Sequence, residues 1–228
     1  MRRFFFIVVA FVVCSNFIYS QVPQITFKPS RGTILTKNDV DKVLIENELT
    51  REDQFECIID NTVTKISDYT FFDCKEMSKL TLSENLTSIE LGAFQFCKNI
   101  KKVIFPASLE EIGEYSFYGC SKLESIIFSV NSKLEIIKDG AFGESAVSEI
   151  TLPKTIKRLG NAFQKCLSLK TITFLSTNPP IFSRTSGFGY EYYLGSDKVT
   201  IKVPKGTKKK YFGALENLDN GYIYKIVE

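Results

Sequence analysis

The sequence predicts a repeat solenoid, a mainly β coil whose successive turns stack their strands into a parallel ladder. A string of the form Phe-x-x-Cys recurs four times, with a Phe-x-x-Ser copy in the gap, and the phenylalanines are 23, 23, 25 and 21 residues apart: Phe71, Phe94, Phe117, Phe142 and Phe163. After each one comes an apolar-x-apolar pair, the alternation of a strand with one buried face. A unit with one such strand cannot bury that face alone, so the units have to stack.

The chain begins with a segment that we expect to be removed before folding. Arg2 and Arg3 precede an apolar run ending at Cys14, and a more polar stretch leads to Ser20. This pattern is typical of a cleaved secretory signal over residues 1–20. Lipidation of Cys14 is the alternative. The run is shorter than the roughly 20 apolar residues of a spanning helix, and no later segment of the mature chain is predicted to cross a membrane.

The remaining chain divides into three parts. We expect an N-terminal cap at 21–56, a solenoid of about five 23-residue repeats at 57–175, and an aromatic loop with a C-terminal cap at 176–228. Caps are needed because an open solenoid exposes apolar core and unpaired strand edges at both ends. Short helices are predicted near 40–45 and 208–218, with short helical or irregular segments returning between strands.

Inside the solenoid, the phenylalanines are expected to stack as a buried aromatic column. Without Cys14, five cysteines remain, so they cannot all pair within one chain. Four occupy the same repeat position, which favours small, buried, free thiols. A disulfide between Cys97 and Cys120 stays open, because stacked neighbours about 4.8 Å apart lie within bonding range.

Strand alternation predicts one contiguous outward sheet face, which is the first candidate site for a partner. Its ten candidate residues are Lys79, Thr81, Lys102, Ile104, Ser125, Ile127, Glu149, Thr151, Thr171 and Thr173. Ser83, Ser129 and Leu175 are expected to share this face. Most of these residues suit any solvated strand, but Ile104 and Ile127 form an adjacent apolar pair with charged neighbours, as a protein-binding patch would.

The second candidate site is the loop at 176–198, which interrupts the repeat. It carries Phe188, Tyr190, Tyr192 and Tyr193. These aromatic side chains either bind a partner, protein or glycan, or fold back over the open end of the solenoid, which is the favoured interpretation.

Composition excludes most catalytic designs. The chain has no histidine, so it has no Ser-His-Asp or Cys-His nucleophile and no His-bound zinc. We predict no enzyme activity, no catalytic residue, no metal and no cofactor; a carboxylate-based glycosidase using Glu110 and Glu111 is a remote alternative. Without Arg2 and Arg3, 27 basic residues face 26 acidic ones, a net charge of about +1. Nucleic acid is therefore not an expected partner.

One repeat reads Ile100-Lys-Lys-Val103-Ile-Phe105-Pro106-Ala-Ser-Leu109-Glu-Glu-Ile112-Gly113-Glu-Tyr-Ser-Phe117-Tyr-Gly-Cys120. It resembles the leucine-rich repeats of the BspA or Treponema pallidum type, whose pattern is L-x-x-I-x-L-P-x-x-L-x-x-I-G-x-x-A-F-x-x-C. The resemblance implies a right-handed leucine-rich-repeat coil in a bacterial protein, secreted or displayed on the cell surface. It also implies binding to an extracellular or surface protein, often in adhesion. The alternative is a glycan-binding or structural surface component.

Overall fold

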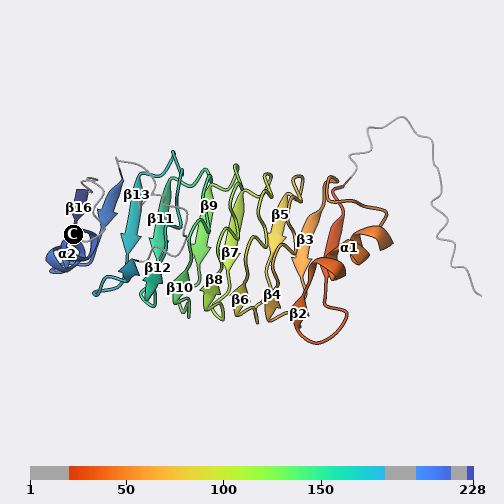
Figure 1. Ribbon diagram of the computed structural model, residues 1–228, viewed down its shortest axis with the longest axis horizontal. Coiled ribbons are helices and arrows are strands. Elements are labelled where there is room, and N and C mark those ends of the chain that lie inside the picture. The colour runs from red at the N-terminus through yellow and green to blue at the C-terminus, as the bar shows by residue number, and fades with distance from the viewer. Residues whose placement is uncertain (1–20, 183–198, 217–224) are drawn as a thin grey trace, which may run out of the picture.

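The computed structural model describes residues 21–182, 199–216 and 225–228 as an elongated parallel β-solenoid (Figure 1). One helix lies at each end of the long axis, and strands from successive turns lie side by side between them. The signal segment 1–20 and the aromatic loop residues Phe188, Tyr190, Tyr192 and Tyr193 lie outside the described residues. The predicted fold class, a stacked parallel coil, is confirmed.

The longer strands form one side of the coil, and their outward side is the predicted sheet face. Their bounds are β1 (Gln24–Phe27), β3 (Glu56–Ile59), β5 (Lys79–Thr81), β7 (Lys102–Phe105), β9 (Ser125–Phe128), β11 (Glu149–Leu152), β13 (Thr171–Phe174), β15 (Thr200–Lys202) and β16 (Lys225–Val227). They form three parallel sheets in the orders β1-β3-β5, β7-β9 and β11-β13-β15-β16. Strands β1 and β15 thus extend the ladder beyond both ends of the predicted repeats.

Short strands form a second, continuous parallel sheet with one strand from each turn. Its members are β2 (Ile34–Leu35), β4 (Lys65–Ile66), β6 (Ser88–Ile89), β8 (Glu111–Ile112), β10 (Ile136–Ile137), β12 (Arg158–Leu159) and β14 (Ile181–Phe182). In each pair from β2 to β12 the second residue points inward and is buried, for example Ile89 and Ile112, which are neighbours in the register; in β14 the inward Phe182 is half-buried. The apolar position before each Phe-x-x-Cys string therefore closes the core from this side.

A third side is built from the turns that carry the Phe-x-x-Cys strings. In each turn, backbone N–H groups donate to carbonyl oxygens of the next turn, as in Phe71 N–H to Ala93 O (2.7 Å) and Asp73 N–H to Gln95 O (2.8 Å). We call this repeating set of hydrogen bonds the turn ladder. Through it, the backbone N–H and C=O groups of these loops have hydrogen-bond partners in the neighbouring turn, as the backbone groups of the strands do.

The phenylalanines of the repeat stack inside the coil, as predicted. Rings of consecutive turns, from Phe71 through Phe94, Phe117 and Phe142 to Phe163, have centroids 5.1, 4.9, 5.8 and 5.8 Å apart and lie within 22° of parallel. None of the five side chains is exposed to solvent. The column fills the core of the turns from Phe71 to Phe163, so apolar contact joins these neighbouring repeats in addition to the hydrogen bonds of the strands and turns.

The five described cysteines are free and buried beside this column. Cys97 and Cys120 donate from Sγ to the carbonyl oxygens of Phe71 and Phe94 in the preceding turns, at 3.1 and 3.3 Å. Burial raises the pKa of the Cys74 thiol to about 12, outweighing the opposite effect of a neighbouring arginine. The cysteines thus serve as small packing groups that also satisfy backbone acceptors.

Both ends carry a helix near the predicted position. Helix α1 (Lys37–Glu46) begins at a capping box in which Thr36 and Asp39 exchange backbone and side-chain hydrogen bonds. Helix α2 (Lys208–Glu216) buries Tyr211, whose hydroxyl donates to Ser176 O at 2.8 Å. Among the described residues, neither helix has the length and apolar character to cross a bilayer.

One outward prediction is wrong. Ser83 is fully buried, because the chain turns after Thr81 and the Ser83 hydroxyl donates to Val63 O at 2.7 Å. The same hydroxyl accepts the Asn85 N–H at 3.1 Å. The alternation of buried and exposed residues along the sequence cannot distinguish a serine that is buried under a turn, with its hydroxyl bonded to the backbone, from a serine that faces solvent.

Candidate binding surface

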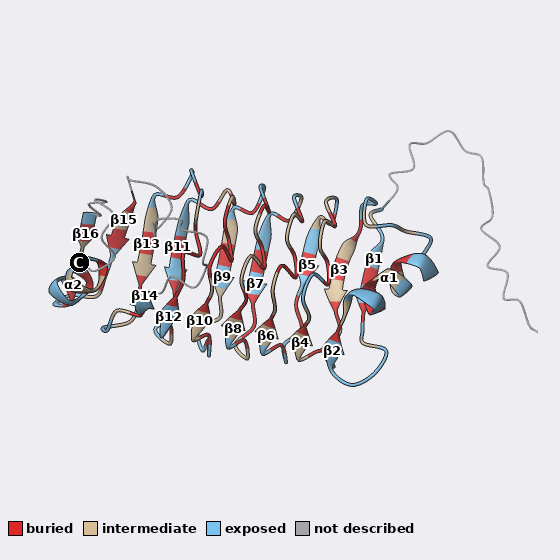
Figure 2. Ribbon diagram, viewed as in Figure 1, coloured by how far each residue is buried: buried red, intermediate tan, exposed pale blue. Residues whose placement is uncertain are grey.

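The sheet face contains all ten candidate residues, and exposed positions alternate with buried ones along its strands (Figure 2). Ile104 and Ile127 are 54 % and 40 % exposed. They are direct register partners across β7 and β9, as Thr151 and Thr173 are across β11 and β13. The predicted apolar pair is therefore contiguous in space, in the middle of the ladder.

Strand register extends this surface beyond the predicted residues. Thr26 pairs with Ile58 and Ile58 with Thr81 at one end, and Thr173 pairs with Lys202 at the other. These register partners, together with the Ile104–Ile127 and Thr151–Thr173 pairs, form one row across the sheet face. Most residues of this row are β-branched, and such side chains have few rotamers on a strand. The Ile25-x-Phe27 and Cys57-x-Ile59 alternations were the signal that could have located the additional residues in β1 and β3.

The strands of the sheet face belong to different sheets at two places, between β5 and β7 and between β9 and β11, and the second break lies next to Ile127. The longer loop after β9 lies at this point, and the Phe128 ring is half-buried although its counterparts Phe105 and Leu152 are buried. A hollow of about 590 Å³ opens there, lined by Ile127, Phe128, Val130, Glu149, Thr151, Lys154, Thr173, Leu175 and Lys202 among others. It begins beside the exposed isoleucine pair and reaches core side chains.

Charges around the hollow are not neutralised locally. Lys154 and Lys202 are exposed, and neither forms an ion pair with a described residue. Glu149 is the carboxylate among the described lining residues. The hollow therefore combines apolar side chains with two available cations.

The opposite sheet has a different electrostatic arrangement. Three pairs of its charged side chains form ion pairs between turns, with N···O distances of 2.8 Å for Lys65–Glu90, 2.6 Å for Lys138–Glu111 and 2.7 Å for Lys157–Glu135. Charges that already have partners gain less from a new one, because binding must first break or desolvate the existing pair. The opposite sheet is therefore the less suitable surface for a charged partner.

A line of aromatic rings along the turn ladder was missed by the sequence analysis. We call it the aromatic edge: Tyr69, Phe72, Phe96, Tyr115 and Tyr118, whose rings meet edge to face at 5.6 to 6.0 Å. Tyr69 is 41 % exposed and the others are half-buried. The signal was present beside the buried phenylalanines, but the equivalent positions are aromatic in some turns and glycine, polar or charged in others.

No group of metal-ligating side chains suited to holding an ion occurs in the part of the chain that the structure describes.

A family model described as the BspA type leucine rich repeat region matches residues 50–170 in six copies. The chain belongs to the BspA-type leucine-rich repeat family. Leucine-rich repeat proteins of this kind are generally binding or structural proteins rather than enzymes, and they typically bind other proteins. No curated protein shows significant sequence similarity to the chain.

Solved structures of bacterial leucine-rich repeat proteins are similar to this family member. A leucine rich cell surface protein from Faecalibacterium prausnitzii A2-165 is 20 % identical with a TM-score of 0.50, covering 81 % of this chain and 58 % of its own. The pneumococcal vaccine antigen PcpA is 26 % identical with a TM-score of 0.49, covering 76 % and 45 %. For the T. pallidum leucine-rich repeat protein the values are 18 %, 0.43, 75 % and 73 %. The chain thus spans about half the length of the first two structures.

Proposed function

We propose that this protein is a secreted or cell-surface binding module that holds another protein on its sheet face. The observation that carries the proposal is the exposed Ile104–Ile127 pair beside a hollow with two unpaired lysines. Membership of a family that typically binds proteins supports it. The division into a signal at 1–20, caps at 21–56 and 176–228 and repeats at 57–175 is part of the same proposal, as are secretion and adhesion.

The partner chemistry follows from the surface. Aliphatic side chains of the partner cover Ile104 and Ile127, and one of them enters the hollow against Phe128. Carboxylates next to that anchor pair with Lys154 and Lys202. A buried apolar anchor surrounded by polar contacts is the usual arrangement of a high-affinity contact. The sheet is already ordered by its ladders, so little conformational entropy is lost when the partner binds.

A binding screen of the mature chain against extracellular proteins and against glycans, by biolayer interferometry, tests the proposal. We expect a protein ligand whose affinity falls by at least about tenfold in the double variant Ile104→Glu plus Ile127→Glu, since two apolar contacts are lost. The matched control is Ile34→Glu plus Ile181→Glu, which changes exposed isoleucines on the opposite sheet. That control should bind like the wild type.

A folded double variant that keeps full affinity would contradict the sheet-face proposal. Binding of glycans alone, lost on substitution of Tyr190, Tyr192 and Tyr193 and indifferent to Ile104 and Ile127, would instead support the glycan alternative. Circular dichroism of each variant shows whether the coil is intact.

A further inference from the structure

The turn ladder has a regular donor and acceptor pattern. In each pair of neighbouring turns, the earlier turn supplies two N–H donors, one from its core phenylalanine and one from the residue two positions later. They donate to the two carbonyl oxygens on either side of the core phenylalanine of the next turn. For Phe94 and Phe96 these acceptors are Ser116 O and Tyr118 O, at 2.7 and 2.8 Å. Every internal turn thus has its two flanking carbonyls occupied by the turn before it.

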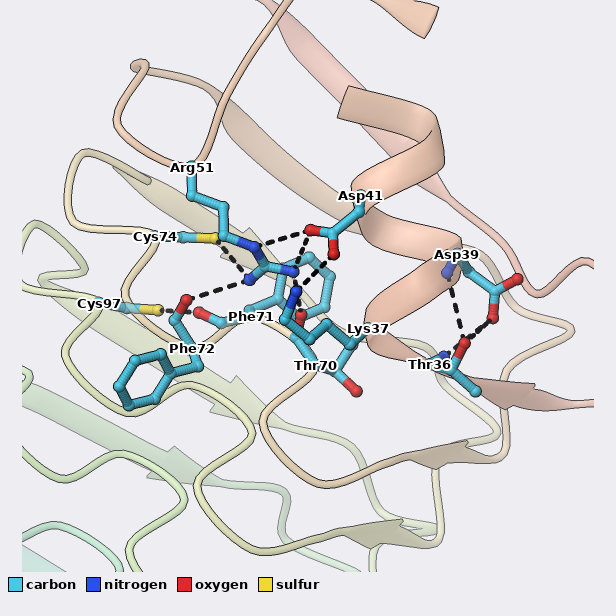
Figure 3. Close-up of polar contacts among 10 residues, drawn as sticks. All are labelled: Thr36, Lys37, Asp39, Asp41, Arg51, Thr70, Phe71, Phe72, Cys74 and Cys97. Atoms are coloured by element: carbon cyan, nitrogen blue, oxygen red, sulfur yellow. Dashed lines mark hydrogen bonds and ion pairs between the residues drawn. The ribbon is translucent and has the colours of Figure 1, made fainter. Parts of the chain in front are cut away.

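The first turn of the ladder has no such predecessor. Its equivalent acceptors are the carbonyl oxygens of Thr70 and Phe72, on either side of Phe71. Both are occupied by Arg51: Nη2 donates to Thr70 O and Nη1 to Phe72 O, each at 3.0 Å (Figure 3). One guanidinium therefore supplies two parallel N–H donors where the other turns receive two backbone N–H groups.

The thiol in this turn also has an unusual partner. Later thiols donate to the phenylalanine carbonyl of the preceding turn, whereas the Cys74 Sγ lies 3.6 Å from Arg51 Nη1. Arg51 thus contacts a third group at the position where a preceding turn would lie.

Helix α1 holds the guanidinium in place. Asp41 accepts from Arg51 Nε at 2.8 Å and from Nη2 at 2.6 Å, and it also accepts from Lys37 at 2.5 Å. The Arg51 side chain is only 18 % exposed. Burial by itself raises the pKa of the Asp41 carboxyl, but the hydrogen bonds from Lys37 and Arg51 have the larger, opposite effect. The net pKa is therefore lowered, and the carboxylate is charged at neutral pH.

We propose that Arg51 terminates the turn ladder by substituting for the two backbone N–H groups of a missing turn, with Asp41 as its positioning residue. The planar fork of arginine can serve two carbonyls and one carboxylate at once, which the single ammonium of lysine cannot do. A simpler hypothesis gives Arg51 only an ion pair with Asp41. The two hypotheses predict different results for a lysine at position 51: lysine can keep the ion pair with Asp41, but it cannot serve both carbonyls as well.

Hydrogen–deuterium exchange of the full chain, followed by mass spectrometry, separates them. Repeat proteins are coupled mainly between neighbouring turns, so a lost terminator should loosen residues 69–74 and leave residues 115–120 unchanged. We expect Arg51→Ala to speed exchange at the Phe71 and Asp73 amides by about tenfold or more, because two buried carbonyls lose their donors. The control Lys157→Ala removes the exposed pair with Glu135 and should change neither segment.

Arg51→Lys is the deciding variant, because it keeps the charge and the aliphatic stem and is the one more certain to fold. We expect it to speed exchange at Phe71 and Asp73 by about threefold or more. A smaller change would overturn the proposal, since an ion pair alone survives the substitution. Unaltered exchange at 69–74 in a folded Arg51→Ala variant would overturn it as well.

Discussion

Replacing Gly119 with alanine tests how the aromatic edge is held on the coil. Gly119 has φ +71°, and a Cβ there would lie 2.7 Å from Cε1 of the Phe96 ring. That ring contacts Phe72 and Tyr118 with centroids 5.8 and 6.0 Å away. It cannot move off the glycine without disturbing both neighbours.

The expected loss has two parts. An alanine in the left-handed region costs about 1–2 kcal/mol, and displacing the half-buried Phe96 ring, which packs between two other rings, costs about 1–3 kcal/mol more. Gly206 offers the matched control, because it has φ +79° and an added Cβ would meet nothing within 4 Å. Gly206→Ala should therefore lose only the conformational part, about 1–2 kcal/mol.

Urea denaturation followed by circular dichroism measures both losses. We predict that Gly119→Ala lowers the free energy of unfolding by about 2–5 kcal/mol, at least about 1 kcal/mol more than Gly206→Ala. Equal losses in the two variants would refute the idea that the ring rests on the Gly119 backbone. The ring would then be a mobile surface group and not part of the coil's packing.

Three further predictions concern the interior and the N-terminal cap. Phe117→Ala should lower the free energy of unfolding by about 3–5 kcal/mol, measured by the same denaturation, because it opens a cavity in the aromatic column. The five buried thiols should not react with Ellman's reagent in the native protein and should all react in denaturant, since burial raises their pKa; rapid native reaction would contradict this. Burial raises the pKa of Asp39, but hydrogen bonds from Ser30 and Thr36 lower it more, from 3.8 to about 2. This stabilisation is therefore complete above pH about 4 and lost as the pH falls through about 2, and Asp39→Asn should abolish it, costing about 2 kcal/mol at pH 7 in denaturation measured against pH.

The interior of the repeats could be predicted because every turn repeats the same chemistry. The phenylalanine spacing identifies the ladder register, and period-2 alternation decides which side each residue takes. Ile104 and Ile127 could therefore be paired before any coordinates, and their register partnership follows from the repeat length. The shared repeat position favoured free cysteines, and the odd number required at least one; the structure shows that all five described cysteines are free and that Cys97 and Cys120 do not form a disulfide.

Features that depend on the end of the coil or on one irregular turn were not predictable in this way. Strands β1 and β2 lack a Phe-x-x-Cys string, so nothing in the repeat pattern marks them as part of the ladder. The longer loop after β9 was visible in the sequence, but the resulting break and hollow depend on backbone geometry. Arg51 is one exposed-looking charge in a polar stretch until its contacts with two carbonyls are seen.

Hydroxyl-radical footprinting of the protein with a captured protein partner tests the sheet-face proposal most directly, because it reads side-chain exposure at single residues. In the free protein Ile104, Ile127, Ile34 and Ile181 should all be labelled, since each is exposed. We predict that the complex protects Ile104 and Ile127 and leaves Ile34 and Ile181 labelled as before. Protection of Ile34 and Ile181 with unchanged labelling of Ile104 and Ile127 would contradict the proposal.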